Sequence, residues 1–165
     1  MNDTDRKIDE IIKIGLATEV NGYNFYKGFA KRVTHEETRD KINVLAGDEI
    51  SHKEVLEKIY RDYFKKEPDN IPEKGIGIFE KALKGKIVNT DITTPALLDI
   101  AIEAESASRD FYMQGEKDAD NEDLKDIFRR LADEEDGHFN LLTAEKTALA
   151  GLNWYAVGDS GYFEH

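Results

Sequence analysis

The feature that most constrains the fold of this 165-residue chain is a short phrase that occurs twice. The sequence "LAGDEISH" occupies positions 45–52 and "LADEEDGH" occupies positions 131–138, and each ends with a Glu and a His three residues apart. A shift of 86 positions aligns the two phrases and several other residues. These further pairs are Glu19 with Glu105, Phe25 with Phe111, Tyr26 with Tyr112, Asp40 with Asp126 and Leu56 with Leu142. The chain is therefore predicted to be a duplicated structural unit.

Apolar residues that recur at every third or fourth position predict four long helices. These helices span about 4–33, 35–66, 94–117 and 122–150. Thr34 with Glu37 has the pattern of a capping box at the start of the second helix. Pro95 stands at the first position of the third helix, which proline favours, and Gly151 is expected to end the fourth helix as its C-cap.

The connection between the second and third helices is unusually long. Adjacent antiparallel helices need about 2–8 connecting residues, whereas residues 67–91 supply 25. A helix of about 30 residues is roughly 45 Å long, and an extended segment of this length can run that distance. The third helix can therefore start at the far end of the bundle. The stretch "GIGIFEKALKG" is expected to form a short helix within this crossover.

The predicted fold is an all-α four-helix bundle over residues 1–150. It is built from two repeated helical hairpins, about 4–66 and 92–150, joined by the long crossover. This is the ferritin-like arrangement of a bundle with one crossover connection. The remaining residues, 151–165, form a tail rich in aromatic side chains, which we expect to cap the bundle or to be buried in a homodimer.

Composition excludes several classes of function. The net charge of −12 would repel nucleic acid and an anionic membrane surface, but it would attract cations or a basic electron donor. The chain contains no cysteine, so disulfides, thiolate nucleophiles and thiolate metal sites are ruled out. It has no apolar run of about 20 residues that could span a bilayer and no signal-peptide pattern at its start. We therefore expect a cytoplasmic protein.

Six polar residues are expected to lie on the apolar faces of the four helices and to point into the bundle. They are Glu19, Glu49, His52, Glu105, Glu135 and His138. Buried carboxylates without partners would cost several kcal/mol each, so something cationic must lie among them. Four carboxylates and two neutral imidazoles nearly balance two divalent cations, and residues three apart on a helix share one face. A single E-x-x-H would suggest a surface pair, but two copies in register predict a dinuclear metal site.

Four segments resemble the rubrerythrin-like branch of the ferritin-like superfamily. They are "ATEVNGYNFY", "AGDEISH", "AIEAESASRDFY" and "ADEEDGH", and the resemblance covers about residues 4–150. It implies a non-haem di-iron oxidoreductase that reduces hydrogen peroxide or dioxygen, often in oxidative-stress defence. Carried over by position, Glu19, Glu49 and His52 would favour one iron. Glu105, Glu135 and His138 would favour the other. Glu49 and Glu135, or their partners, would bridge the two ions.

Two departures from the rubrerythrin pattern bear on activity. Rubrerythrins carry a four-cysteine rubredoxin domain, which this chain lacks, so electrons would come from a separate donor such as a rubredoxin. They also place a further Glu three residues after the third-helix ligand, where this chain has Ser108, with Gly22 as its repeat counterpart. The remaining six-ligand set is similar to the ferroxidase centre of bacterioferritin.

These departures leave alternatives to a peroxide reductase. One is a ferroxidase that serves iron storage, and another is a non-redox bundle stabilised by zinc. Carboxylates and imidazoles bind iron, manganese and zinc alike, so the ligand types do not select the metal. A metal-free bundle with six buried polar residues is the remaining alternative.

Several residues beside the predicted ligands have two interpretations. Tyr26 and Tyr112 lie two helical turns beyond a ligand Glu. We favour core aromatics with satisfied hydroxyls over groups that hydrogen-bond a bridging carboxylate or pass an electron. Asp48 and Glu134 precede the Glu of each E-x-x-H pair, and we favour a surface position over a role as acceptors for His. Glu103 is interpreted as a solvated acid.

Overall fold

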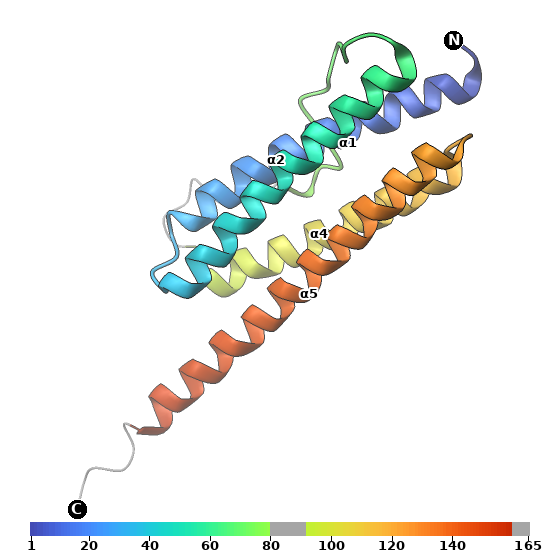
Figure 1. The fold of residues 1–165 in the computed structure, drawn as a ribbon. Helices are drawn as coiled ribbons and strands as arrows, with labels where there is room; N and C mark the ends of the chain where they lie inside the picture. The colour runs from blue at the N-terminus through green and yellow to red at the C-terminus, as the bar shows by residue number, and fades with distance from the viewer. Residues whose placement is uncertain (80–91, 160–165) are drawn as a thin grey trace, which may run out of the picture.

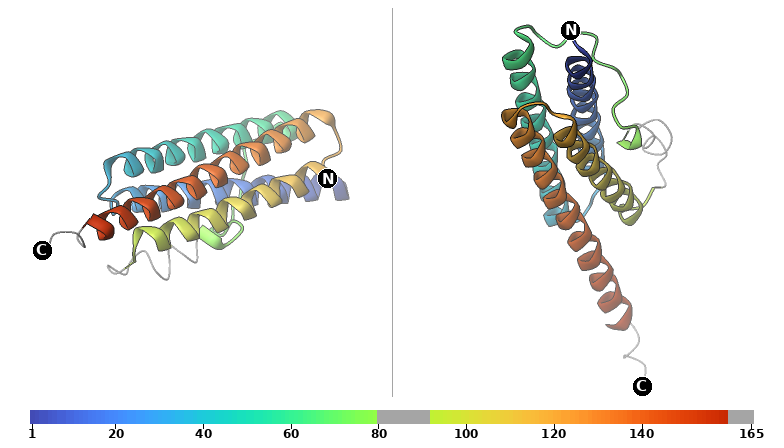
Figure 2. Two further views of the ribbon diagram at one scale, coloured as in Figure 1. Left: turned by 90° about the horizontal axis from the view of Figure 1, so that it is seen from below. Right: turned by 90° about the vertical axis from the view of Figure 1, so that its right-hand side faces the viewer.

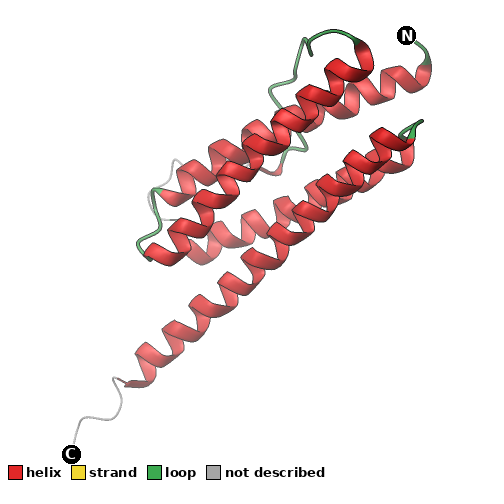
Figure 3. Ribbon diagram, viewed as in Figure 1, coloured by secondary structure: helices red, strands yellow, loops and turns green. Residues whose placement is uncertain are grey.

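The computed structural model describes residues 1–79 and 92–159, of which 153–159 are described as backbone alone. Four long helices account for most of this part of the chain (Figure 1). They are α1 (Asp3–Ala30), α2 (Glu36–Phe64), α4 (Thr94–Asp118) and α5 (Glu122–Asp159). The described residues contain no strand (Figure 3), and none of their helices is long and apolar enough to cross a membrane. The predicted all-α four-helix bundle is thereby confirmed.

The first hairpin begins each of its helices with a side-chain cap. The Asn2 side chain accepts a hydrogen bond from the backbone N–H of Asp5, and the Asp5 carboxylate accepts one from the N–H of Asn2. The predicted cap of α2 at Thr34 was wrong by one residue. His35 is the N-cap, and its Nδ1 lies 3.3 Å from the backbone nitrogen of Thr38. An imidazole nitrogen thus accepts the hydrogen bond that a hydroxyl was expected to accept.

The second hairpin begins in the predicted way. Thr93 caps α4 and its hydroxyl accepts from the N–H of Ala96, with Pro95 in the first turn. Asn121 does the same for α5, because its side-chain oxygen accepts from the N–H of Leu124 at 3.0 Å. Each of the four helices therefore begins at a side-chain cap supplied by the residue that precedes it.

Helix α5 does not end where the sequence predicts. The helix continues through Gly151 to Asp159, so the expected end at about residue 150 was wrong. A glycine ends a helix when it adopts a positive φ, and the only described glycine with a positive φ is Gly77. The last turns of α5 project beyond the rest of the bundle (Figures 1 and 2). Residues 160–165 lie outside the described part, and the homodimer stays a prediction.

The crossover lies along α1. The Lys13 ammonium is 3.0 Å from an Asp69 carboxylate oxygen, and the Thr18 hydroxyl accepts a hydrogen bond from the backbone N–H of Ile76. Further along, the ring of Phe79 is buried against α1. Asp69 contacts Lys13 in the first half of α1 and Phe79 contacts Phe25 near its end, so the segment runs in the direction of α1 and returns towards the end where α1 finishes. The short helix expected in this crossover falls largely on residues outside the described part.

The two hairpins pack more closely within themselves than against each other. Helix α1 packs along α2, and α4 packs along α5, whereas α1 meets α4 and α2 meets α5 over fewer residues (Figure 2). Because the crossover spans the bundle, α4 runs antiparallel to α1. The two halves of the repeat consequently face each other head to tail, and corresponding residues meet near the middle.

The apolar core is divided into two clusters, one towards each end of the bundle. One cluster is centred on Phe25, Tyr26, Phe29, Ile42, Leu45, Leu97, Leu98, Ala101 and Leu142. The other is centred on Ile8, Ile12, Leu16, Leu56, Tyr60, Tyr112, Leu124, Phe128 and Leu131. Along every helix the predicted polar residues fall between the members of these clusters. The bundle therefore encloses a polar layer between two apolar ones.

Replacing Phe79 with Ala tests how firmly the crossover is held. The Phe79 ring is 2% exposed, and its centroid lies 5.3 Å from that of Phe25 and 5.8 Å from that of Tyr26. We expect Phe79→Ala to lower the free energy of unfolding by about 3–5 kcal/mol, the usual cost of removing a buried ring. Ile71→Ala, at a 42% exposed crossover position, should cost less than about 0.5 kcal/mol. Urea denaturation measures both, and equal losses would contradict this packing.

Candidate metal centre

The structure brings all six predicted residues to the middle of the bundle. Glu19 comes from α1 and Glu105 from α4, whereas α2 and α5 each supply one E-x-x-H pair. All six are 8% exposed or less. One nitrogen or oxygen atom from each residue can be chosen so that the atoms form two groups, each within 4.8 Å of one another: Glu19, Glu49 and His52, and Glu49, Glu105, Glu135 and His138. Glu49 belongs to both groups, as a carboxylate that bridges two cations would.

Both imidazoles direct Nδ1 towards this interior. Nδ1 of His52 lies 3.4 Å from Glu19 Oε2 and 3.4 Å from Glu135 Oε1. Nδ1 of His138 lies 3.1 Å from Glu135 Oε2 and 3.6 Å from Glu105 Oε2. The two rings are stacked, with centroids 5.5 Å apart. Glu135 therefore contacts both imidazoles. With Glu49, it is one of the two residues predicted to bridge the metal ions.

Several buried atoms of this group have no hydrogen-bond partner among the described residues. They are Glu19 Oε2, Glu49 Oε1, His52 Nδ1 and Glu105 Oε2. An unpaired buried polar atom is costly, and three carboxylate oxygens and one imidazole nitrogen without partners in one place are unusual in a native core. Oxygen and imidazole nitrogen are the donor types that iron, manganese and zinc accept. The donor set therefore fits two divalent cations.

Burial is the largest influence on the pKa values of the carboxyl groups. It raises the pKa of Glu49 well above its usual range, and repulsion from neighbouring carboxylates raises it further. Burial and repulsion from Glu135 raise the pKa of Glu105 to about 8, although His138 acts in the opposite direction. At Glu135 burial also favours the protonated form, but attraction to the nearby His138 and His52 imidazoles outweighs it, so its pKa is lowered.

The pKa values of the two imidazoles are raised by the neighbouring carboxylates, although burial acts against this. Burial by itself would lower the pKa of His52, but its interactions with Glu135 and Glu19 raise it to about 11. The pKa of His138 is likewise raised to about 10, by Glu105 and Glu135 against the effect of burial. Four carboxylates in one buried space thus favour any positive charge placed among them. A metal cation that binds there displaces protons, so low pH weakens its binding.

Two tyrosines reach the carboxylates across the bundle. The Tyr26 hydroxyl of α1 donates to Glu105 of α4, and the Tyr112 hydroxyl of α4 donates to Glu19 of α1. Both tyrosines are fully buried, and burial together with the carboxylate charges raises the pKa of each phenol well above its usual range. Of the two interpretations from sequence, the hydrogen bond to a candidate ligand is the one observed, and both rings also belong to the core.

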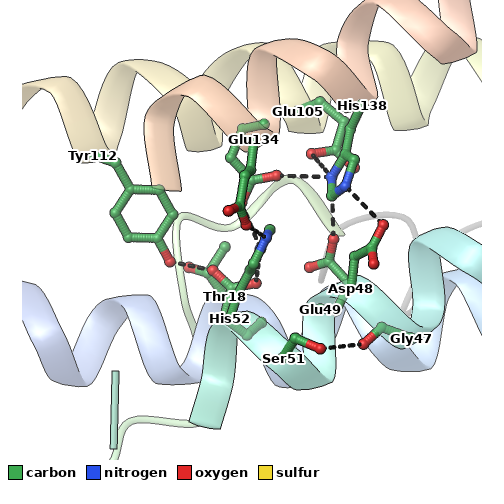
Figure 4. A network of polar contacts seen from close by, with 12 residues as sticks. Thr18, Gly47, Asp48, Glu49, Ser51, His52, Glu105, Tyr112, Glu134 and His138 are labelled. Atoms are coloured by element: carbon green, nitrogen blue, oxygen red, sulfur yellow. Dashed lines mark hydrogen bonds and ion pairs between the residues drawn. The ribbon is translucent and has the colours of Figure 1, made fainter. Parts of the chain in front are cut away.

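Two acids expected at the surface also contact the site. Nε2 of His52 lies 2.7 Å from Glu134 Oε2, and Nε2 of His138 lies 3.2 Å from Asp48 Oδ2 (Figure 4). Both carboxylate side chains are about half exposed, at 50% and 46%. Both acids are therefore partly exposed, as predicted, and each also contacts an imidazole of the site. Glu103, by contrast, is exposed as predicted.

Gly22 leaves room for Glu49. A Cβ built on Gly22 would lie 2.9 Å from Cδ of Glu49, closer still to its Oε2, and 3.3 Å from Cε2 of Phe79. The Glu49 carboxylate thus lies where a side chain at position 22 would project. Ser108, the counterpart of Gly22 in the repeat, is buried at 1% exposure. Neither position carries a fifth carboxylate that would add a seventh candidate ligand.

We expect Gly22→Ala to weaken metal binding at least about tenfold, the size of effect usual for changes beside metal ligands. The new methyl group displaces the flexible end of Glu49 rather than backbone, so the melting temperature of the metal-free protein should change little. Gly47→Ala is the matched control, because a Cβ at Gly47 meets nothing within 4 Å. Metal titration by calorimetry compares the two variants. Equal metal affinities would show that the Gly22 contact does not position Glu49.

Comparison with known proteins agrees with this geometry. A family model described as Rubrerythrin matches residues 10–146, a range that contains all six candidate ligands. A solved structure of a hypothetical protein from Pyrococcus furiosus is similar to this chain, with a TM-score of 0.68 and 26% sequence identity. The similarity covers 93% of this chain and 95% of that one. No curated protein matches. Since the family model covers most of its length, the chain belongs to the rubrerythrin family.

Proposed function

We propose that this protein binds two iron ions at the bundle centre and reduces hydrogen peroxide or dioxygen with electrons from a separate donor. The observation that carries the proposal is the gathering of four carboxylates and two imidazoles with unpartnered atoms aimed at a common interior. Membership of the rubrerythrin family supports iron as the metal. The absence of cysteine from the sequence supports an external donor, because the chain has no thiolate iron site of its own.

The iron ions and the protein would have separate roles in this reaction. When bound, a ferrous pair would supply the two electrons that reduce one peroxide, with two protons, to two waters. The protein's own part is to hold the carboxylates and imidazoles at fixed positions on four helices. Glu49 and Glu135 contact groups from both halves of the site, so they are the residues proposed to bridge.

The residues around the site support a redox reaction in an interior shielded from bulk water. Apolar clusters lie on both sides of the polar layer and exclude bulk water along the bundle axis. The Tyr26 and Tyr112 hydroxyls hold one oxygen of Glu105 and of Glu19, which limits the rotation of each carboxylate. Their other oxygens remain directed to the interior. Glu19 and Glu105 are therefore each held in place by a tyrosine of the opposite hairpin.

Two alternatives are favoured by specific observations. The six-residue set without a further carboxylate at Ser108 or Gly22 favours a ferroxidase that serves iron storage. The donor types, carboxylate and imidazole, also suit zinc, which would make the site structural and non-redox. Metal analysis of the protein isolated from its native cells separates the zinc alternative from the other two.

Removing the two central carboxylates tests the metal site. We expect the parent protein to bind two ferrous ions per chain, and Glu49→Ala combined with Glu135→Ala to bind fewer than one, because both groups of donor atoms then lose a member. Anaerobic equilibrium dialysis with metal analysis measures the stoichiometry. Glu103→Ala, which removes an exposed acid from α4, should leave it unchanged. Equal uptake by all three proteins would show that the two carboxylates do not bind the metal, as the alternative of a metal-free bundle centre predicts.

Rapid mixing identifies the oxidant. The protein is loaded anaerobically with ferrous iron and mixed with equal concentrations of peroxide or dioxygen, and the near-ultraviolet absorbance of ferric iron is followed. For a peroxide reductase we expect peroxide to react at least about tenfold faster than dioxygen; this ratio corresponds to about 1.4 kcal/mol of activation free energy. A faster reaction with dioxygen would favour the ferroxidase, and no oxidation with either would favour the structural site.

A further inference from the structure

A charged group is buried between the two hairpins away from the metal centre. Glu145 of α5 is 5% exposed, and both of its carboxylate oxygens have partners on α2. The Thr38 hydroxyl donates to Oε1, and the Lys41 ammonium donates to Oε2 at 2.6 Å. Burial by itself would raise the pKa of Glu145, but Lys41 and Thr38 outweigh it and the pKa is lowered. The charge of Glu145 is therefore stabilised by the opposite hairpin.

The internal repeat has apolar residues at the corresponding positions. A shift of 86 positions aligns Thr38 with Leu124, Lys41 with Ile127 and Glu145 with Ile59. All three counterparts belong to, or pack against, the apolar cluster at the other end of the bundle. The two ends of the α2–α5 contact thus differ in chemistry, although the repeat makes them equivalent in position.

The metal centre does not distinguish the two hairpins in this way. Each hairpin supplies two carboxylates and one imidazole, and each supplies one tyrosine that donates to a carboxylate of the other. Two copies of the first hairpin, or two copies of the second, could therefore assemble an equivalent centre. The crossover of 25 residues is long enough for two chains to exchange their hairpins.

We propose that the cluster of Thr38, Lys41 and Glu145 makes the α2 surface of the first hairpin selective for the second hairpin and against another copy of itself. In a pair of second hairpins, each Glu145 would face the two apolar counterparts of Thr38 and Lys41. A buried charge without its partner is strongly destabilising. In a pair of first hairpins, Thr38 and Lys41 would lose their acceptor. Only unlike hairpins satisfy all three groups, and this holds whichever metal the centre binds.

Replacing the cluster by its counterparts in the full chain tests the proposal. The variant Thr38→Leu/Lys41→Ile/Glu145→Ile repeats the apolar contact of the other end, so like and unlike pairs become similar in free energy. Lys41→Glu/Glu145→Lys reverses the ion pair, which only unlike hairpins can form. Asp99→Ala/Lys146→Ala is the control, because it removes an exposed ion pair within the second hairpin.

Spin labels on single cysteines report which hairpins have paired, because the natural chain contains no cysteine. Ser51→Cys and Gly137→Cys place a label at corresponding exposed positions of α2 and α5. His52 contacts Glu134, the counterpart of Asp48, so in a like pair position 52 would face position 48 of the other copy. Two labels at position 51 would then lie at nearly the same height on adjacent helices, and the same holds at 137. Unlike pairs keep such labels in separate bundles.

Pulsed EPR after refolding from urea measures the distances between labels. We expect the triple variant to raise the share of chains with a short distance at both positions at least about tenfold over the parent, the effect of about 1.4 kcal/mol. The reversed pair and the control should stay at the parent level. Short distances in the parent or in the reversed pair would overturn the proposal, and so would a triple variant without them. A rise of the same size in the control would attribute the effect to lost charge alone.

Discussion

The rest of the structure depends on the need to balance four carboxylates buried in the middle of a helical bundle. Glu19, Glu49, Glu105 and Glu135 are all 2% exposed or less, and they lie between two apolar clusters. Repulsion among them raises the pKa values of neighbouring groups and draws positive charge inwards. A core of this kind is stable only when protons, imidazolium groups or metal cations supply that charge.

The contacts that control this charge cross between the hairpins. Tyr26 and Tyr112 exchange hydrogen bonds with carboxylates of the opposite half, and His52 and His138 exchange contacts with Glu134 and Asp48 in the same crossed pattern. The hairpins pack mainly within themselves, and the contacts between them combine these polar pairs with the two apolar clusters, each of which contains residues of both hairpins.

Much of the fold and the site could be predicted from sequence because both follow from short-range periodicity. Residues three apart share a helix face, so Glu49 with His52 and Glu135 with His138 were placed correctly, and the 86-residue repeat identified the other two carboxylates. Local details were less secure. The N-cap of α2 lies one residue later than predicted. Helix α5 continues through Gly151, because backbone conformation rather than residue type decides whether a glycine ends a helix.

The sequence by itself determined the four helices, the duplication and the six residues that face inwards. Only the tertiary structure decided which partners meet, because Tyr26 and Glu105 are 79 residues apart, and His52 and Glu134 are 82 apart. Periodicity assigns a residue to a face of its own helix, but it does not fix the height at which another helix passes. That height is set by the crossover along α1 and by the packing of two apolar clusters, and it brings Asp48 and Glu134 to the opposite imidazoles.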